Sequence, residues 1–313
     1  MAQVTVEPEE KARTDALPFT LDSKLRELLD GFKWANRCKN TSAVIINDGK
    51  SGKGKTTLCG QEAAYCDASY MDKNINLKKI HWNPETFLNG EVDGNGNVTK
   101  IGLKQAQQGD VIILDEAMII NNRSAMSDLN RAIVIAMSMI RSKKIIVIFN
   151  VNSLFDLDKN LAIFRSDLLC HVYGDSLTDR GKFMAFFQGA DGVDRIKELY
   201  IEGKKHYDYN KPHSNFNTQF GKYFVFDEDE YEKQKNLGVA NYLATKNKAE
   251  KATKAGMQRN RAVIYLRQNL KMGVKEISNI LLCPPTTIYR IMQEHSIGDL
   301  MEKEFKEFPE SKD

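Results

Sequence analysis

The sequence predicts an α/β protein in which a parallel sheet is covered by helices on both faces, followed by a small all-α module. Two observations predict the first part: short apolar runs alternate with helical patterns, and a glycine-rich turn joins the first run to a helix. The second part is predicted by two short amphipathic helical patterns near the C-terminus. With 313 residues, 42% of them hydrophobic, the chain can form one large domain or two unequal ones.

The expected strands are almost continuously apolar and β-branched, as strands buried on both faces are. Helical patterns cover about residues 55–68 and 125–141. Two further strand patterns, at 182–188 and 222–227, and a helical pattern at 228–244 extend this domain. The five core strands are expected at residues 42–47, 78–82, 110–117, 143–150 and 167–173.

Charge is distributed unevenly along the chain. The formal net charge is only +3, yet residues 246–275 hold nine basic residues and one acidic residue, a local charge of +8. The predicted order is a flexible N-terminal tail, an α/β domain with a core and an extension, a basic linker, a helical module and an acidic tail. These parts are assigned to residues 1–20, 21–245 (core about 40–175), 246–258, 259–298 and 299–313.

Several classes of protein are disfavoured. The five cysteines are scattered and form no CxxC pair or Cys/His cluster, so we expect neither a disulfide framework nor a zinc site. A reducing, intracellular, cytoplasmic setting fits this cysteine usage. The longest strongly apolar run, residues 132–140, is too short to cross a bilayer, so no membrane insertion is expected.

The glycine-rich turn carries a phosphate-binding pattern. Gly49, Gly54, Lys55 and Thr56 match G-x-x-x-x-G-K-[ST] between an expected strand and an expected helix. Glycines let successive backbone N–H groups point at phosphate oxygens, and the helix adds its positive end. Lys55 is expected to reach the β- and γ-phosphates and Thr56 to bind Mg²⁺. The predicted ATP-binding residues are Gly49, Lys50, Ser51, Gly52, Lys53, Gly54, Lys55, Thr56 and Thr57, with the ammonium groups of Lys50 and Lys53 solvated.

A second acidic element supports a nucleotide-hydrolysing site. The run "VIILDE" is an apolar strand that ends in Asp115 and Glu116. In an enzyme with this phosphate loop, Asp115 is expected to hold the Mg²⁺ shell. Glu116 is expected to polarise the attacking water.

This pairing resembles the additional-strand, catalytic-glutamate (RecA/ASCE-like) branch of P-loop ATPases. Within it, residues 40–235 look most like FtsK/HerA-type DNA pumps, including viral genome-packaging ATPases and the zonular-occludens-toxin group. The resemblance is carried by "IHWNPETFLNG", "AMSMIRSKKIIVIFNVN" and "GKYFVFDEDEYEKQK". It implies a sheet in which one strand separates the phosphate-loop strand from the acidic strand, with Asn150 sensing the γ-phosphate. The group often has glutamine after this strand, and the asparagine here departs from that pattern.

The same resemblance implies that the chain forms a homo-oligomeric ring. It also implies that a virus or mobile element can encode such a chain, and that the ring can work with other parts of a packaging or transfer machine. In such rings an arginine of one subunit stabilises phosphate charge in the next subunit's site. Arg141 is the first candidate for this role, with Arg123 and Arg131 as alternatives.

The C-terminal pattern "GVKEISNILLCPPTTIYRIMQ" matches a helix-turn-helix. Ile277, Ile288 and Ile291 are expected to face inward, and Leu282 stands where glycine commonly lets the turn bend. The residues left on the outer face of the second helix, and predicted to contact double-stranded DNA, are Thr286, Thr287, Tyr289 and Arg290.

The resulting hypothesis is a Mg²⁺-dependent ATPase that translocates or packages DNA. Two alternatives remain open at this level. One is a non-motor DNA-binding switch in which ATP sets assembly, as in helicase loaders, transposition partners or partition proteins. The other is an ATPase adaptor whose C-terminal module binds protein.

Overall fold

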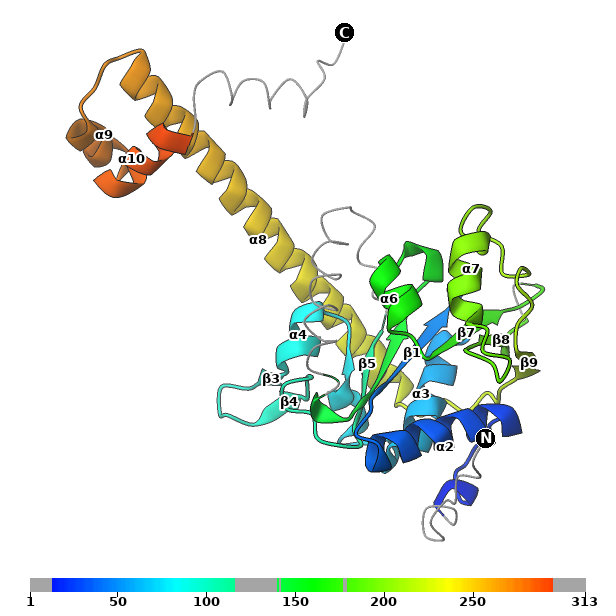
Figure 1. Cartoon of the computed structure of the whole chain (residues 1–313). Coiled ribbons are helices and arrows are strands. Elements are labelled where there is room, and N and C mark those ends of the chain that lie inside the picture. Colours follow the sequence, from blue (N-terminus) through cyan, green and yellow to red (C-terminus); the bar gives the residue numbers. More distant parts are fainter. Residues whose placement is uncertain (1–12, 116–139, 141, 177–178, 295–313) are drawn as a thin grey trace. The chain divides into compact units, whose positions relative to one another are not determined.

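A computed structural model describes residues 13–115, 140, 142–176 and 179–294 of the chain (Figure 1). The chain divides into two compact units, Met1–Val239 and Ala240–Asp313. Residues 246–258, predicted as a linker, are helical and belong to α8 (Glu228–Gln268), which no proline interrupts. Where the module begins stays a prediction.

The first unit is built on a seven-stranded sheet with the order β2-β5-β6-β1-β7-β8-β9. β1 pairs in parallel with β6 and β7, and β5 pairs in parallel with β2 and β6. β6 therefore lies between β1 and β5, as the additional-strand resemblance implied. The strands are β1 (Ala43–Asp48), β2 (Ile80–His81), β5 (Val111–Leu114), β6 (Ile146–Asn150), β7 (Leu168–Tyr173), β8 (Lys182–Phe186) and β9 (Phe216–Gln219).

The sheet is mostly parallel rather than entirely so. β8 runs antiparallel to β7, and β9 runs antiparallel to β8. The expected strand at 182–188 is therefore present, whereas the expected strand at 222–227 is wrong, because those residues are not extended into the sheet. Residues of the 222–227 segment instead pack against α3. A separate hairpin of β3 (Glu91–Val92) and β4 (Val98–Lys100) encloses a turn at 93–97.

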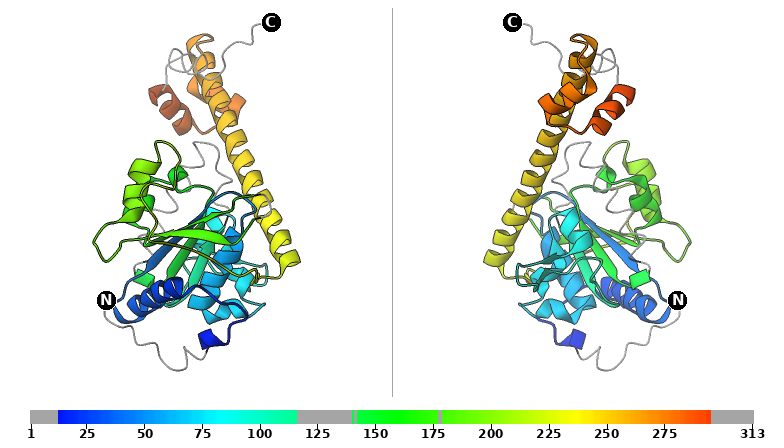
Figure 2. Two further views of the ribbon diagram at one scale, coloured as in Figure 1. Left: turned by 90° about the vertical axis from the view of Figure 1, so that its right-hand side faces the viewer. Right: turned by 90° about the vertical axis from the view of Figure 1, so that its left-hand side faces the viewer.

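Helices cover both faces of the sheet (Figures 1 and 2). Alternate residues of the strands point to opposite faces, so Val44 and Ile46 join one apolar cluster while Ile45 joins the other. The first cluster includes α4 (Pro84–Asn89), α6 (Lys159–Phe164) and α7 (Arg195–Gly203). The second includes α2 (Ser23–Cys38) and α3 (Lys55–Cys66). Short 3-10 turns lie at Ala68–Met71, Asn76–Lys79 and Leu154–Asp156.

Part of the expected flexible tail is packed against the rest of the first unit. The guanidinium of Arg13 donates to the carbonyl oxygen of Tyr65 at 2.8 Å, and Phe19 is buried in the cluster that contains α2 and α3. These contacts of residues 13–20 differ from the flexible tail that was predicted for residues 1–20. Burial of the Phe19 ring stabilises the contact.

The second unit has a small apolar core of its own. α9 (Val274–Leu281) and α10 (Pro285–Glu294) are joined by a three-residue turn. Ser278 Oγ donates to the carbonyl oxygen of Cys283 at 2.8 Å and ties the two sides of this turn together. The core of the unit is formed by Val263, Ile264, Ile277, Cys283, Ile288 and Ile291.

Candidate functional site

A loop with left-handed glycines connects β1 to α3. Gly49, Gly52 and Gly54 have φ angles of 129°, 77° and 99°, which L side chains rarely adopt. A Cβ atom on Gly49 would lie 2.0 Å from the carbonyl oxygen of Val172, so no larger residue fits there. The glycines predicted from the phosphate-binding pattern therefore have a backbone that requires them.

Positive charge and uncapped helix N–H groups meet at this loop. Gly54 is the N-cap of α3, and as a glycine it offers no side-chain cap to the first turn. Lys55 folds back over the loop, where its Nζ donates to the carbonyl oxygen of Gly49 at 2.6 Å and to Asn152 Oδ1 at 3.3 Å. N–H groups, a helix N-terminus and an ammonium group together favour a bound anion such as phosphate.

A carboxylate from the neighbouring part of the sheet lies next to this loop. Asp115 follows β5 and is only 1% exposed. Its Oδ2 lies 3.4 Å from Thr56 Oγ1, and its Oδ1 accepts a hydrogen bond of 2.9 Å from Asn150 Nδ2. A hydroxyl and a carboxylate are hard oxygen ligands that suit a hydrated Mg²⁺, which uses few protein ligands. These residues therefore fit the metal that the phosphate-loop pattern implies.

Tyr231, in the first turns of α8, is a member of this site that the sequence did not reveal. Its hydroxyl donates to Asp115 Oδ2. Burial and the neighbouring Asp115 carboxylate raise the pKa of the Tyr231 phenol far above its usual value, so the phenol remains a donor. Tyr231 lies 116 residues from Asp115 in the chain, and no local pattern signals the contact.

The two asparagines after β6 have different places. Asn150, predicted to sense the γ-phosphate, is 1% exposed and its amide is turned to Asp115. Asn152 is exposed and its Oδ1 lies beside Lys55 Nζ. The polar group beside the Lys55 ammonium is therefore Asn152, whereas the Asn150 amide donates to Asp115. The sensing role predicted for Asn150 stays a prediction. The two asparagines stand only two residues apart, which is why the sequence pattern could not separate them.

The two lysines expected to be solvated also differ. Lys50 is exposed, as predicted, together with Ser51. Lys53 is only 8% exposed, and its Nζ donates to the carbonyl oxygens of Ser176 and Asp179, the latter at 3.3 Å. Lys53 thus ties the phosphate loop to the segment after β7, and the expectation of a solvated ammonium was wrong.

A buried polar cluster lies directly before the loop. Asp48, the last residue of β1, is fully buried and accepts hydrogen bonds from the Tyr209 hydroxyl, from His171 Nδ1 at 2.8 Å and from the Leu154 backbone N–H at 2.7 Å. The His171 and Tyr209 rings stack with centroids 3.6 Å apart. These contacts fix the end of β1, from which the glycine loop departs.

Four predicted residues cannot be placed. Glu116, Arg123, Arg131 and Arg141 lie outside the described residues, as does most of the helix expected at 125–141. Their assignments stay predictions. Thr57 is half-buried in the first turn of α3, next to Thr56.

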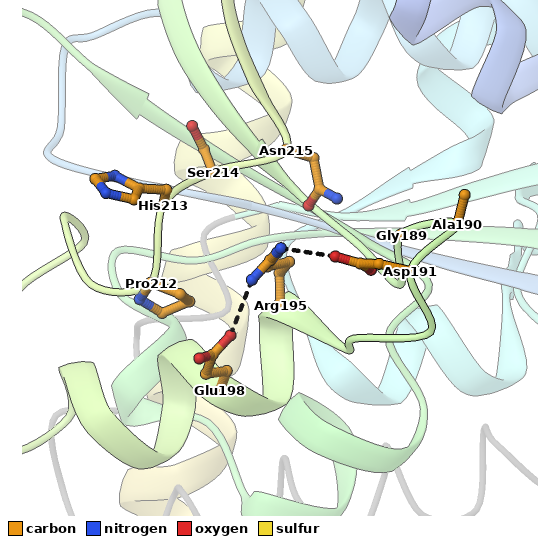
Figure 3. Close-up of a pocket in the computed structure, with 9 residues that line it drawn as sticks. All are labelled: Gly189, Ala190, Asp191, Arg195, Glu198, Pro212, His213, Ser214 and Asn215. Atoms are coloured by element: carbon orange, nitrogen blue, oxygen red, sulfur yellow. Dashed lines mark hydrogen bonds and ion pairs between the residues drawn. The ribbon is translucent and has the colours of Figure 1, made fainter.

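A separate surface pocket is lined by none of the residues that were predicted to bind nucleotide or metal (Figure 3). Its one arginine, Arg195, pairs with Asp191 at 2.8 Å and with Glu198 at 3.3 Å. Two carboxylates offset the guanidinium charge, so the pocket lacks the excess positive charge of the phosphate loop.

In the second unit, the outer face of α10 is polar. Thr286, Tyr289 and Arg290 are exposed and Thr287 is half-buried, whereas Ile288 is fully buried. These side chains therefore have the placement that the predicted contact face requires. Whether they bind DNA stays a prediction.

No protein-family model and no curated protein matches the chain. Among solved structures, the chain is similar to the N-terminal domain of zonular occludens toxin from Neisseria meningitidis, at 13% identity and a TM-score of 0.31. The match covers 61% of this chain and 98% of that domain. A TM-score below 0.5 does not establish a common fold.

Two kinds of feature are absent from the described residues. They contain no helix long and apolar enough to cross a membrane. They also contain no cluster of three or more histidine, cysteine, aspartate or glutamate side chains able to hold a metal ion. A Mg²⁺ site that relies on one hydroxyl, one carboxylate and the nucleotide's own phosphates needs no such cluster.

Proposed function

We propose that this chain is a Mg²⁺-dependent ATPase that translocates or packages double-stranded DNA as an oligomeric ring. The observation that carries the proposal is that three side chains lie together at a loop whose backbone requires glycine. Lys55 donates to the loop carbonyl of Gly49, and Thr56 contacts Asp115. The reaction is ATP plus water to ADP and phosphate.

Each group at the site has a role in this chemistry. The backbone of residues 49–57 and the Lys55 ammonium bind the phosphates, while Thr56 and Asp115 hold Mg²⁺. The metal supplies neutralisation of charge on the transferring phosphoryl group. Asn152, whose Oδ1 lies 3.3 Å from Lys55 Nζ, is proposed to contact the terminal phosphate in place of Asn150. Glu116 follows Asp115 directly and is assigned to polarise the attacking water.

We also propose that the chain belongs to the FtsK/HerA-type group of additional-strand P-loop ATPases. The position of β6 between β1 and β5 supports an additional-strand P-loop ATPase. Resemblance of the sequence to FtsK/HerA-type pumps supports a ring in which an arginine acts between subunits. Arg141 remains the first candidate for that contact, with Arg123 and Arg131 as alternatives.

The second unit is proposed to bind duplex DNA through a helix-turn-helix. The exposed face of α10 carries Tyr289 and Arg290, and its opposite face is buried in the unit's core. The sequence from residue 246 to 275 adds a local charge of +8, which favours binding to phosphate backbones. The side chains of α10 are then available to base edges in the major groove.

A non-motor DNA switch is the second candidate function. The observation that favours it is that the second unit has its own core and its own polar face, which allow DNA binding without movement along DNA. An adaptor whose second unit binds protein is distinguished from both by the absence of DNA-stimulated hydrolysis.

The test compares the wild-type protein with Lys55→Ala and Lys50→Ala. Lys50 is the matched control, because it is an exposed lysine of the same loop. We expect Lys55→Ala to weaken ATP binding by about tenfold or more, which corresponds to about 1.4 kcal/mol, and Lys50→Ala to leave it unchanged. Wild-type protein should hydrolyse ATP faster with duplex DNA and displace the third strand of a triplex. Hydrolysis without displacement would favour the switch, and absence of Mg²⁺-dependent ATP binding would refute the proposal.

A further inference from the structure

The chain that follows β9 packs onto the phosphate-loop helix. Gln61 Nε2 donates to the carbonyl oxygens of Gly221 and Tyr223, at 2.8 Å each. A Cβ atom on Gly60 would lie 3.0 Å from the Phe226 ring, so α3 and this segment are in direct contact. Residues 221–226 therefore lie against α3, the helix that begins at the phosphate loop.

Tyr231, in the first turns of α8, is held in place by the aromatic side chains around it. The side chain is 3% exposed. Its ring lies edge-on to Trp82 and to Phe224, both at 5.5 Å between centroids, and stacks with Phe226 at 5.7 Å. Aromatic contacts on several sides fix where the hydroxyl points. The hydroxyl is directed at Asp115 rather than at solvent or at a backbone carbonyl.

Asp115 thereby receives a side-chain donor on each carboxylate oxygen. Asn150 donates to Oδ1, and Tyr231 donates to Oδ2. Two donors on different oxygens fix the plane of the carboxylate. Because an ionised carboxylate oxygen offers about two acceptor sites, Oδ2 can accept from Tyr231 and still face the Thr56 hydroxyl.

We propose that Tyr231 is a positioning residue for the Mg²⁺ site, which it serves by orienting Asp115. This inference rests on the proposed function of Thr56 and Asp115. Hydrogen-bond partners behind a metal-binding carboxylate commonly set its orientation, and their loss typically costs 10–100-fold in metal affinity. The metal site consequently depends on α8, more than fifty residues beyond the last core strand predicted from the sequence.

The test is a Mg²⁺ titration of the binding of a fluorescent ATP analogue to the full chain. Tyr231→Phe keeps the ring and removes the donor. We expect the Mg²⁺ concentration for half-maximal binding to rise about tenfold. Nucleotide binding in EDTA should be unchanged, because the phosphate loop is intact.

Tyr70→Phe is the matched control. Tyr70 is fully buried in the same apolar cluster, but its hydroxyl donates to the backbone carbonyl of Val111 at 2.9 Å. This variant should keep the wild-type Mg²⁺ requirement. Both variants should show cooperative thermal unfolding, which establishes that each is folded.

A second measurement asks whether Tyr231 acts through Asp115. In an Asp115→Asn background, Tyr231→Phe should cause no further change in the Mg²⁺ requirement. An undiminished effect in that background, an equal effect of Tyr70→Phe, or an unchanged or lower Mg²⁺ requirement of Tyr231→Phe would each overturn the inference. If the wild-type protein bound ATP without any dependence on Mg²⁺, the proposed metal site itself would fall. The two failures are thus distinguishable.

Discussion

Asn152 and Lys55 meet beside the phosphate loop, where Asn152 Oδ1 lies 3.3 Å from Lys55 Nζ. Asn150, two residues earlier, is buried and donates to Asp115. The end of β6 thus supplies two amides in different environments. The exposed Asn152 amide lies beside Lys55, whereas the buried Asn150 amide donates to the Asp115 carboxylate. The two substitutions below should therefore have different consequences.

Asn152→Ala is expected to lower the rate of ATP hydrolysis by about 100–1,000-fold, as for other groups that stabilise charge in a transition state. Folding stability should stay unchanged, because Asn152 is exposed. Asn150→Ala should instead lower the free energy of unfolding by about 1–3 kcal/mol, since it leaves a buried acceptor without its donor. Steady-state hydrolysis and urea unfolding of both variants measure the two effects. Equal loss of hydrolysis in both, with equal stability, would contradict this division.

Lys53→Met should destabilise the protein, although Lys53 belongs to the loop that is proposed to bind nucleotide. The substitution removes the ammonium that donates to the carbonyl oxygens of Ser176 and Asp179. Hydrogen bonds from charged groups contribute about 1.5–3 kcal/mol, so a loss of that size is expected in urea unfolding. The exposed Lys50, changed to Met, is the control and should alter stability by less than about 0.5 kcal/mol. Equal effects of the two changes would mean that Lys53 is solvated.

Glu62 should make the stability of the first unit depend on pH. It is fully buried on α3, where burial raises the pKa of its carboxyl from 4.5 to about 7. Because the folded state binds this proton more tightly than the unfolded state, the stabilisation is fully present below pH 4.5. It is lost as pH rises through about 7. The cost of ionisation at pH 8 is on the order of 3 kcal/mol.

Glu62→Gln removes this titration and should stabilise the protein at pH 8 more than at pH 5. The Asn47 amide, whose Nδ2 donates to Glu62 at 2.7 Å, can rotate to accept from glutamine, because its Oδ1 has no partner among the described residues. Thermal unfolding at both pH values measures the difference. The exposed Glu232, changed to Gln, should give a difference that does not vary with pH. A difference independent of pH for Glu62→Gln would mean that the carboxyl titrates normally.

The core of the site was predictable because its signals are local. The apolar run that becomes β1, the glycines and Lys55 stand within a few residues of one another, and Asp115 directly follows an apolar strand. A parallel sheet then brings the carboxyl ends of these strands together. Thr56 and Asp115 were for this reason expected to meet, and they do.

The parts that the sequence did not predict depend on distant contacts. Tyr231 reaches Asp115 from α8, and Lys53 reaches carbonyl oxygens more than a hundred residues away. Residues 222–227 alternate like a strand, yet they cover α3 and leave the edge of the sheet to β9. Periodicity reports which side chains are apolar but not which surface buries them.

Arg290→Ala should weaken binding to duplex DNA by about 1–3 kcal/mol if Arg290 contacts bases. Arg290 is exposed on α10, so the substitution should not disturb the core of the second unit. Lys205→Ala, at an exposed site of the first unit, is the control and should change affinity little. Fluorescence anisotropy at several salt concentrations measures both. Wild-type affinity of the Arg290 variant for every duplex tested would remove Arg290 from the contact face.

Leu282→Gly should stabilise the second unit. Leu282 ends α9 in the left-handed conformation, with φ 48° and ψ 43°, and is 90% exposed. That conformation costs a residue with a Cβ atom about 1–2 kcal/mol, and an exposed leucine offsets little of it by packing. After subtraction of the greater entropy of glycine in the unfolded chain, a gain of about 0.5–1 kcal/mol is expected.

Ile280→Gly is the matched control for this change, because Ile280 is also exposed but lies inside α9. Glycine in a helix interior costs about 1 kcal/mol, so the two neighbouring substitutions should have opposite signs. Amide hydrogen exchange at Ile277 and Ile288 reports the stability of this unit separately from the first. Protection should rise in Leu282→Gly and fall in Ile280→Gly. A fall in both would mean that the Leu282 side chain, rather than its backbone conformation, determines how the turn between α9 and α10 is held.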